Sequence, residues 1–97
     1  MEGTQVIAAL REATLDAWRT TGSMVKRVEV GADAFEALLV HLGRFAQTVP
    51  GPGLKLFLTA GDMVVIPHAS LSQHARIHTV SGDVCTTGAI FESATAS

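Results

Sequence analysis

The spacing of apolar side chains changes near residue 54 from the period of a helix to the period of a strand. Before this point, two segments, 5–20 and 33–46, repeat apolar residues every three or four positions, which is typical of an amphipathic helix. After it, short runs alternate apolar and polar residues, which is typical of half-buried strands. Helices followed by several short strands predict a domain of the α+β class.

The first helix is predicted over residues 5–20, with Thr4 as its N-cap and Gly22 as its end. Residues 21–24 then form a short linker. An alternative is that the domain proper begins at Met24 and that the helix is foreign to the fold. The apolar stripe of the helix favours the first interpretation, because a helix that belongs to a fold needs such a stripe to bury.

The second helix is predicted over residues 33–46. Its helical spacing places five large side chains on one side, where they are expected to enter the core: Phe35, Leu38, Leu39, Leu42 and Phe45. Val40 lies among the polar residues of the other side. A tolerated exposed valine is the simpler interpretation, and a partner surface is the alternative.

Strands are predicted in five segments bounded by turn-forming residues: 25–30, 54–59, 63–66, 73–80 and 84–87. Gly61 and Asp62 are expected to form the turn of a hairpin, and residues 47–53 a loop with Pro50-Gly51 at the centre of a type II turn. Residues 89–91 are a possible short edge strand. The predicted order is α-β-α-β-β-β-β, with both helices packed on one face of a mostly antiparallel sheet.

The chain is long enough for one domain and one core, because it has 97 residues. Within that domain we expect an N-terminal helix and linker over 1–23, an α+β core over 24–92 and a frayed tail over 93–97. No internal repeat divides the chain.

Charged side chains are scarce, and this scarcity gives the main functional expectation. They make up 16% of the chain, whereas about 25% is usual for a globular domain. A small domain has much surface to cover, so we expect another chain to cover part of it, in a homo-oligomer or with a protein partner. The alternative is a monomer with an alanine-rich surface.

Several partners and locations are excluded by composition. Seven Lys and Arg against nine Asp and Glu form no basic stripe, so nucleic acid is not expected as a partner. No apolar run approaches the roughly 20 residues that span a bilayer, so no membrane association is expected. Cys85 is the single cysteine, and the N-terminus does not resemble a secretion signal, so we expect a cytoplasmic protein.

Three histidines crowd the segment that precedes Cys85, namely His68, His74 and His78. Imidazole and thiolate suit zinc, and in a helix His74 and His78 could share one ion. The β-branched residues around His78 favour a strand instead, in which the two rings stand roughly 13 Å apart. We therefore predict no metal site and no cofactor.

The strand interpretation gives a candidate binding surface. His74, Arg76 and His78 would alternate on one face, with His68 close by in the chain. Such a face can accept an anion or an acidic side chain, and it gains charge as the pH falls toward 6. The competing interpretation is an ordinary half-exposed strand with polar histidines.

No complete catalytic set is present, so no catalytic residue is predicted, and Cys85 is interpreted as a small buried apolar residue. Our hypothesis is a small non-enzymatic protein that acts by macromolecular binding or self-association. Val28-x-Val30 leading into Phe35-x-x-Leu38-Leu39 resembles short proteins of phages and mobile elements as a class. This resemblance implies an accessory or inhibitor protein. The alternative is a small metal- or anion-binding protein, or an enzyme, centred on residues 68–78.

Overall fold

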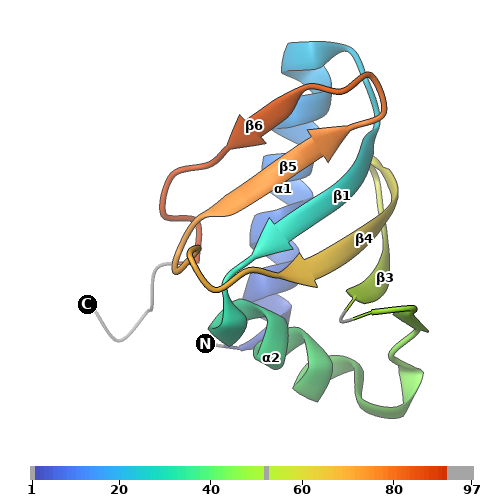
Figure 1. Ribbon diagram of the computed structural model, residues 1–97, viewed down its shortest axis with the longest axis vertical. Helices are drawn as coiled ribbons and strands as arrows, with labels where there is room; N and C mark the ends of the chain where they lie inside the picture. Colours follow the sequence, from blue (N-terminus) through green and yellow to red (C-terminus); the bar gives the residue numbers. More distant parts are fainter. Residues whose placement is uncertain (1, 52, 92–97) are drawn as a thin grey trace.

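The computed structural model describes residues 2–51 and 53–91, which form two α-helices and one six-stranded sheet (Figure 1). In chain order the elements are α1 (Gly3–Thr21), β1 (Val25–Val30), α2 (Ala32–Leu42), the short 3-10 helix η1 (Gly43–Phe45), β2 (Thr48–Val49), β3 (Gly53–Leu58), β4 (Gly61–Pro67), β5 (Ala75–Thr79) and β6 (Val84–Thr86). The predicted α+β class and the packing of helices against a mostly antiparallel sheet are confirmed. The predicted tail over 93–97 lies outside the described residues.

The sheet has the spatial order β2-β3-β4-β1-β5-β6. β1 lies between β4, which is parallel to it, and β5, which is antiparallel to it. Every other neighbouring pair is antiparallel. A parallel neighbour requires a long crossover connection, and α2 lies in the segment that connects β1 to β4.

The structure corrects three predictions, which concern a hairpin turn, a loop and a short edge strand. The hairpin turn lies at residues 59–60, because Leu58 pairs with Gly61, so Gly61 and Asp62 belong to β4. The predicted loop 47–53 contains the two-residue strand β2, which pairs with β3. Residues 89–91 form no strand; they make a turn that brings the buried side chain of Phe91 to the core. Each error concerns a turn or a pairing of one or two residues, which the pattern of apolar residues does not locate.

The helix α1 buries one face against the sheet and ends where the sequence predicted. Val6, Leu10 and Ala17 are buried, and the buried Thr14 hydroxyl donates a hydrogen bond to the Leu10 carbonyl oxygen at 2.7 Å. Gly22 ends the helix with a φ of 70°, a conformation that glycine adopts without steric cost. The predicted N-cap was wrong: Thr4 lies inside the helix, and Glu2 and Gln5 form a reciprocal capping box. These buried residues place α1 in the same core as the sheet.

The helix α2 is shorter than predicted and buries smaller side chains. Its fully helical part stops at Leu42, and its buried residues are Ala34, Ala37 and Leu38. Two side chains predicted for the core are exposed instead, Leu39 at 38% and Phe45 at 73%. The 3-10 turn changes the angular spacing of residues, which turns Phe45 away from the stripe of α2.

We expect the substitution Phe45→Ser to lower the free energy of unfolding by less than about 1 kcal/mol, because an exposed ring contributes mainly its cation–π contact. Arg44 provides that contact, with its guanidinium carbon 5.1 Å from the ring centroid. Urea unfolding of the two proteins would measure the difference. A loss of about 3–5 kcal/mol, the cost of deleting a buried phenylalanine, would contradict this placement.

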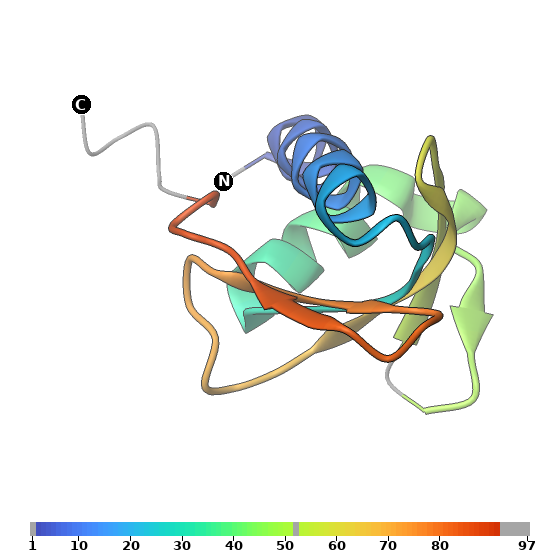
Figure 2. The same ribbon diagram turned by 90° about the horizontal axis from the view of Figure 1, so that it is seen from above.

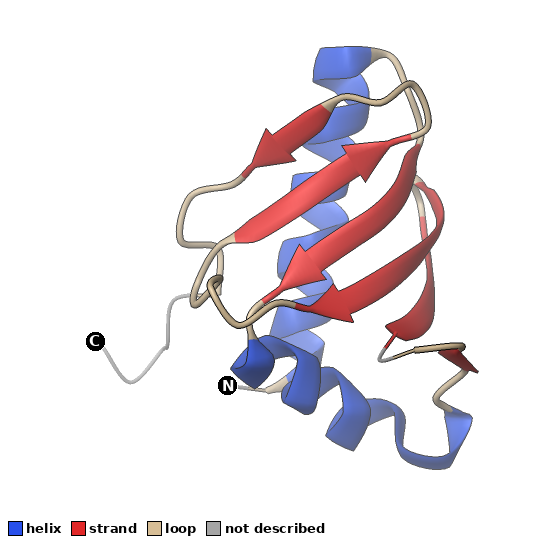
Figure 3. Cartoon of the chain, in the orientation of Figure 1, coloured by secondary structure: helices blue, strands red, loops and turns tan. Residues whose placement is uncertain are grey.

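Both helices lie on the same side of the sheet (Figure 2). Val28 and Val30 of β1, Val65 of β4 and Ile77 of β5 point to that side and are buried with residues of α1 and α2. Figure 3 shows the strands in front of α1, so that the opposite face of the sheet is turned toward the viewer with no helix over it. This opposite face is the surface on which the candidate site lies.

Candidate binding surface on the open face of the sheet

The uncovered side of the sheet, here called the open face, is built by the alternation of side chains in five neighbouring strands, which in β1 begins after an irregularity between Val25 and Arg27. Where one residue is buried toward the helices, the next points away from them. The open face consists of Lys55 and Phe57 from β3, Asp62, Val64 and Ile66 from β4, Arg27 and Glu29 from β1, Arg76 and His78 from β5, and Val84 and Thr86 from β6.

Strand register arranges these side chains in rows that cross the sheet. One row contains, in spatial order, Lys55, Val64, Arg27, His78 and Val84. The next row contains Ile66, Glu29, Arg76 and Thr86. Directly opposite residues on neighbouring strands are close enough for their side chains to interact. The two rows therefore bring together residues that are far apart in the chain.

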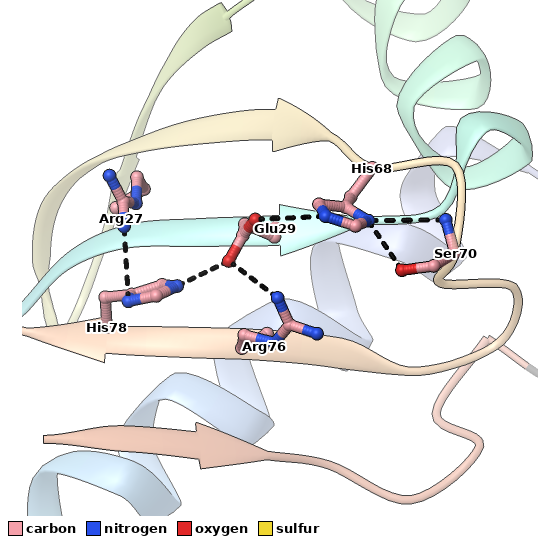
Figure 4. Close-up of polar contacts among 6 residues, drawn as sticks. All are labelled: Arg27, Glu29, His68, Ser70, Arg76 and His78. Atoms are coloured by element: carbon pink, nitrogen blue, oxygen red, sulfur yellow. Dashed lines mark hydrogen bonds and ion pairs between the residues drawn. The ribbon is translucent and has the colours of Figure 1, made fainter.

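Glu29 is the centre of a polar cluster in these rows (Figure 4). Its oxygen Oε1 accepts a hydrogen bond from His78 Nε2 at 2.5 Å and lies 3.5 Å from Arg76 Nη1. Its other oxygen, Oε2, lies 3.9 Å from His68 Nε2. The side chains of Glu29 and His78 are each only 14% exposed, so this pair is largely withdrawn from water.

The hydrogen bonds of both histidines define the same tautomer. Arg27 Nη2 donates to His78 Nδ1 at 3.3 Å, and because a guanidinium has no acceptor, Nδ1 must accept. At His68, Nδ1 lies 2.7 Å from Ser70 Oγ and accepts a hydrogen bond from the Ser70 backbone N–H at 3.3 Å. In both rings the hydrogen is therefore assigned to Nε2, the atom that faces Glu29.

The surroundings of Glu29 keep its carboxylate ionised. Burial raises the pKa of Glu29, but the hydrogen bond from His78 and the electrostatic attraction of His78, Arg76 and His68 lower it by more than burial raises it. The net result is a pKa below the ordinary value of 4.5. Near neutral pH the centre of the open face is thus a carboxylate surrounded by cationic and imidazole groups.

Three of the four predicted binding residues meet in this cluster, namely His68, Arg76 and His78. The fourth, His74, does not: β5 begins at Ala75, so the prediction that His74 alternates with Arg76 and His78 in one strand was wrong. His74 Nδ1 is instead 3.1 Å from the Thr87 carbonyl oxygen. The binding role of all four residues stays a prediction.

Sequence reasoning missed Glu29, Arg27 and Ser70. Arg27 and Glu29 alternate with the buried Val28 and Val30, which is a signal that they share the outer side of the strand. The pairing of β1 with β5, which brings His78 to them, has no local signal in the sequence. The contact from Ser70 to His68 depends on a turn whose shape the sequence does not specify.

The cluster does not form a catalytic triad or a metal site. Serine, histidine and glutamate are present, but the 3.9 Å between His68 Nε2 and Glu29 Oε2 exceeds a hydrogen bond, and Ser70 lies in an exposed turn. Cys85 pairs with the buried Ile77 and lies on the helix side of the sheet, away from these histidines. Within residues 2–51 and 53–91, no group of three His, Cys, Asp or Glu side chains could hold a metal ion.

Two hollows in the described part of the chain lie away from Glu29 and its partners. One of about 740 Å³ lies between the N-terminal end of α1, the length of α2 and residues 72–73, and one of about 600 Å³ lies between α1 and β6. Neither is lined by a residue of the Glu29 cluster.

No helix among the described residues combines the length and the apolar character needed to cross a membrane. Comparisons of the chain with protein families, with curated proteins and with solved structures found no match.

Proposed function

We propose that this chain is a non-enzymatic protein that binds another protein chain through the open face of its sheet. The observation that carries the proposal is the arrangement of two helices on one side only, which leaves one face of five strands without a covering helix. A soluble sheet face that is not covered by its own chain is available to a partner.

The chemistry of the open face suits a protein interface. Phe57 of β3 is 58% exposed, and Val64 and Ile66 of the next strand, β4, lie beside Arg27 and Glu29. On the other side of the polar cluster, Val84 of β6 is 54% exposed and lies beside His78. Protein interfaces are enriched in aromatic side chains and arginine, which this face provides in Phe57, Arg27 and Arg76. The hydrogen bonds around Glu29 hold several side chains in place, which lowers the entropy cost of binding.

Self-association through the same face is one form of this proposal, and the low share of charged residues supports it. The edges of the sheet are less suited to it, because β2 has two residues and β6 has three. Very short edge strands are poor templates for adding a further strand. We also propose a cytoplasmic location, because Cys85 is the single cysteine of the chain. Binding another protein is how an accessory or inhibitor protein of a phage or mobile element would act.

The test is a double substitution on the open face, Phe57→Ser with Val64→Ser, compared with Val40→Ser. Val40 is 76% exposed on α2, on the helix side of the sheet, so its replacement controls for the loss of exposed apolar surface. Light scattering after size exclusion would measure self-association, and affinity capture with the three proteins would measure partner binding.

We expect the double substitution to abolish dimerisation or partner capture and Val40→Ser to leave both unchanged. If the wild-type protein is a monomer and every captured protein is retained equally by the three variants, the proposal is wrong. Circular dichroism of each variant establishes that the fold is kept.

A further inference from the structure

We infer that the partner recognised by the open face is an acidic segment of a protein, whose carboxylates bind Arg27 and Lys55 and compete with Glu29 for Arg76 and His78. This inference rests on the proposed function and adds to it the chemical class of the partner. It follows from the contacts, exposure and charges of five side chains on the face.

Two cations of the open face are available to a partner. Arg27 is exposed, and its guanidinium makes one hydrogen bond to a described residue, the bond to His78 Nδ1. Lys55 is exposed and forms no ion pair within the described chain. Both lie in one row with Val64 between them, so their Cα atoms are about 10 Å apart, two strand spacings. A partner segment with one apolar side chain between two carboxylates could place the carboxylates on Lys55 and Arg27 and the apolar side chain on Val64.

The charges of the chain are divided unevenly between the open face and the remaining surface. Three of the seven Lys and Arg side chains lie on the face, namely Arg27, Lys55 and Arg76. Two of the nine Asp and Glu side chains lie there too, namely Glu29 and Asp62. The face thus has an excess of one positive charge, although the whole chain has a net charge of −2. Charge complementarity of this kind selects an acidic partner and speeds its association.

Glu29 already occupies the position that a partner carboxylate would take. It accepts from His78 and pairs with Arg76, which are the donors that an incoming carboxylate would use. Its negative charge also repels such a group. Glu29 is therefore an internal competitor, and its neutralisation should strengthen binding of an acidic partner while it weakens the fold. A residue with a purely structural role would not produce this opposite pair of effects.

The face is better matched to a protein carboxylate than to a nucleic acid. Evenly spaced phosphates would come close to Glu29 and Asp62, which repel them. Phe57 is the one Phe, Tyr or Trp ring among the side chains of the face, which offers little for base stacking. An acidic peptide can instead place apolar side chains over Val64 and Ile66 and its carboxylates over the cations.

The experiment measures fluorescence anisotropy of a labelled peptide of alternating glutamate and alanine with one central leucine, added to the full chain. A peptide with glutamine in place of every glutamate is the control ligand. We expect Arg27→Gln and Lys55→Gln each to weaken binding about threefold to tenfold, which corresponds to one ion pair. Arg11→Gln on α1, an exposed residue on the helix side, should leave the affinity unchanged.

The decisive variant is Glu29→Gln, which should bind the acidic peptide about threefold to tenfold more tightly than the wild type. Circular dichroism confirms at the assay temperature that each variant is folded. A solution of twofold higher ionic strength should weaken all of these affinities.

Four results would overturn the inference: equal binding of the glutamine peptide, no effect of Arg27→Gln and Lys55→Gln, weaker binding by Glu29→Gln, or tighter binding of a single-stranded oligonucleotide. A second copy of the chain that occupies the open face and excludes the peptide would overturn it too. In that last case the proposed function still holds. The proposed function fails on its own test if the peptide binds but the double substitution Phe57→Ser with Val64→Ser changes neither partner capture nor dimerisation.

Discussion

Replacing Gly31 by alanine is expected to lower the free energy of unfolding by about 3 kcal/mol, the upper part of the usual range for overpacking. Gly31 is the N-cap of α2, and its backbone lies directly under the loop at Leu71 and Ser72. A Cβ atom at this position would overlap the carbonyl oxygens of both residues. Because the overlap is with backbone, it cannot be relieved by rotating a side chain, and the buried Leu71 would have to move.

Urea unfolding followed by circular dichroism would measure this effect, with Gly88→Ala as the matched control. A Cβ at Gly88 meets no atom within 4 Å, and Gly88 has no positive φ, so its replacement should change stability by less than about 0.5 kcal/mol. The Gly31 substitution should also displace the turn that holds His68 near Glu29. A Gly31→Ala protein as stable as the wild type would show that residues 71–72 do not pack on Gly31.

The second large effect expected is that of Glu29→Gln, which should cost about 1–2 kcal/mol of stability at pH 7. The substitution removes a largely buried charge and leaves Arg76, His78 and His68 without the carboxylate that they face. Thermal unfolding should show a midpoint lower by about 4–8 °C for each kcal/mol lost. Glu12→Gln, at an exposed position on α1, should change the midpoint little.

The lowered pKa of Glu29 predicts that the loss of stability caused by Glu29→Gln depends on pH. Burial raises the pKa of Glu29, but the hydrogen bond from His78 and the nearby positive charges outweigh it, so the pKa in the folded protein lies below 4.5. The unfolded chain therefore takes up this proton more readily than the folded one, and ionised Glu29 stabilises the fold at pH values above 4.5. This contribution is lost as the pH falls through the folded pKa.

The difference in stability between the wild type and Glu29→Gln should accordingly be constant from pH 7 to about 5 and shrink below the ordinary glutamate pKa. Urea titrations at several pH values would measure it. An unchanged difference in strong acid would show that the effect of the substitution does not come from the charge of Glu29.

The sequence predicted most of the elements because their signals are local. The period of apolar residues located α1, β1 and the β3–β4 hairpin, and Gly22 marked the end of α1. The end of α2 was missed because the stripe of apolar residues continues through Phe45, whereas the backbone changes to a 3-10 turn after Leu42. The strand β2 has no pattern of its own, because two residues are too few to show alternation.

The candidate site was predicted only in part for the same reason. His68, Arg76 and His78 are neighbours in the chain, so the sequence could group them. Glu29, which joins them, is contributed by a strand from the first third of the chain, and its position beside Arg76 depends on the register of β1 with β5. Register between distant strands is determined by the packing of the whole sheet and not by local sequence.

The central position of β1 also determines the order in which this protein can fold. Both of its neighbours, β4 and β5, come from the second half of the chain, so a growing polypeptide cannot complete the middle of the sheet until residues beyond 60 are made. The β3–β4 hairpin has short-range contacts and can form early, whereas β1 must wait for loop closure over long stretches of chain. Refolding should therefore be slower than for helical proteins of similar size, with docking of β1 between its two neighbours as the late, rate-limiting event.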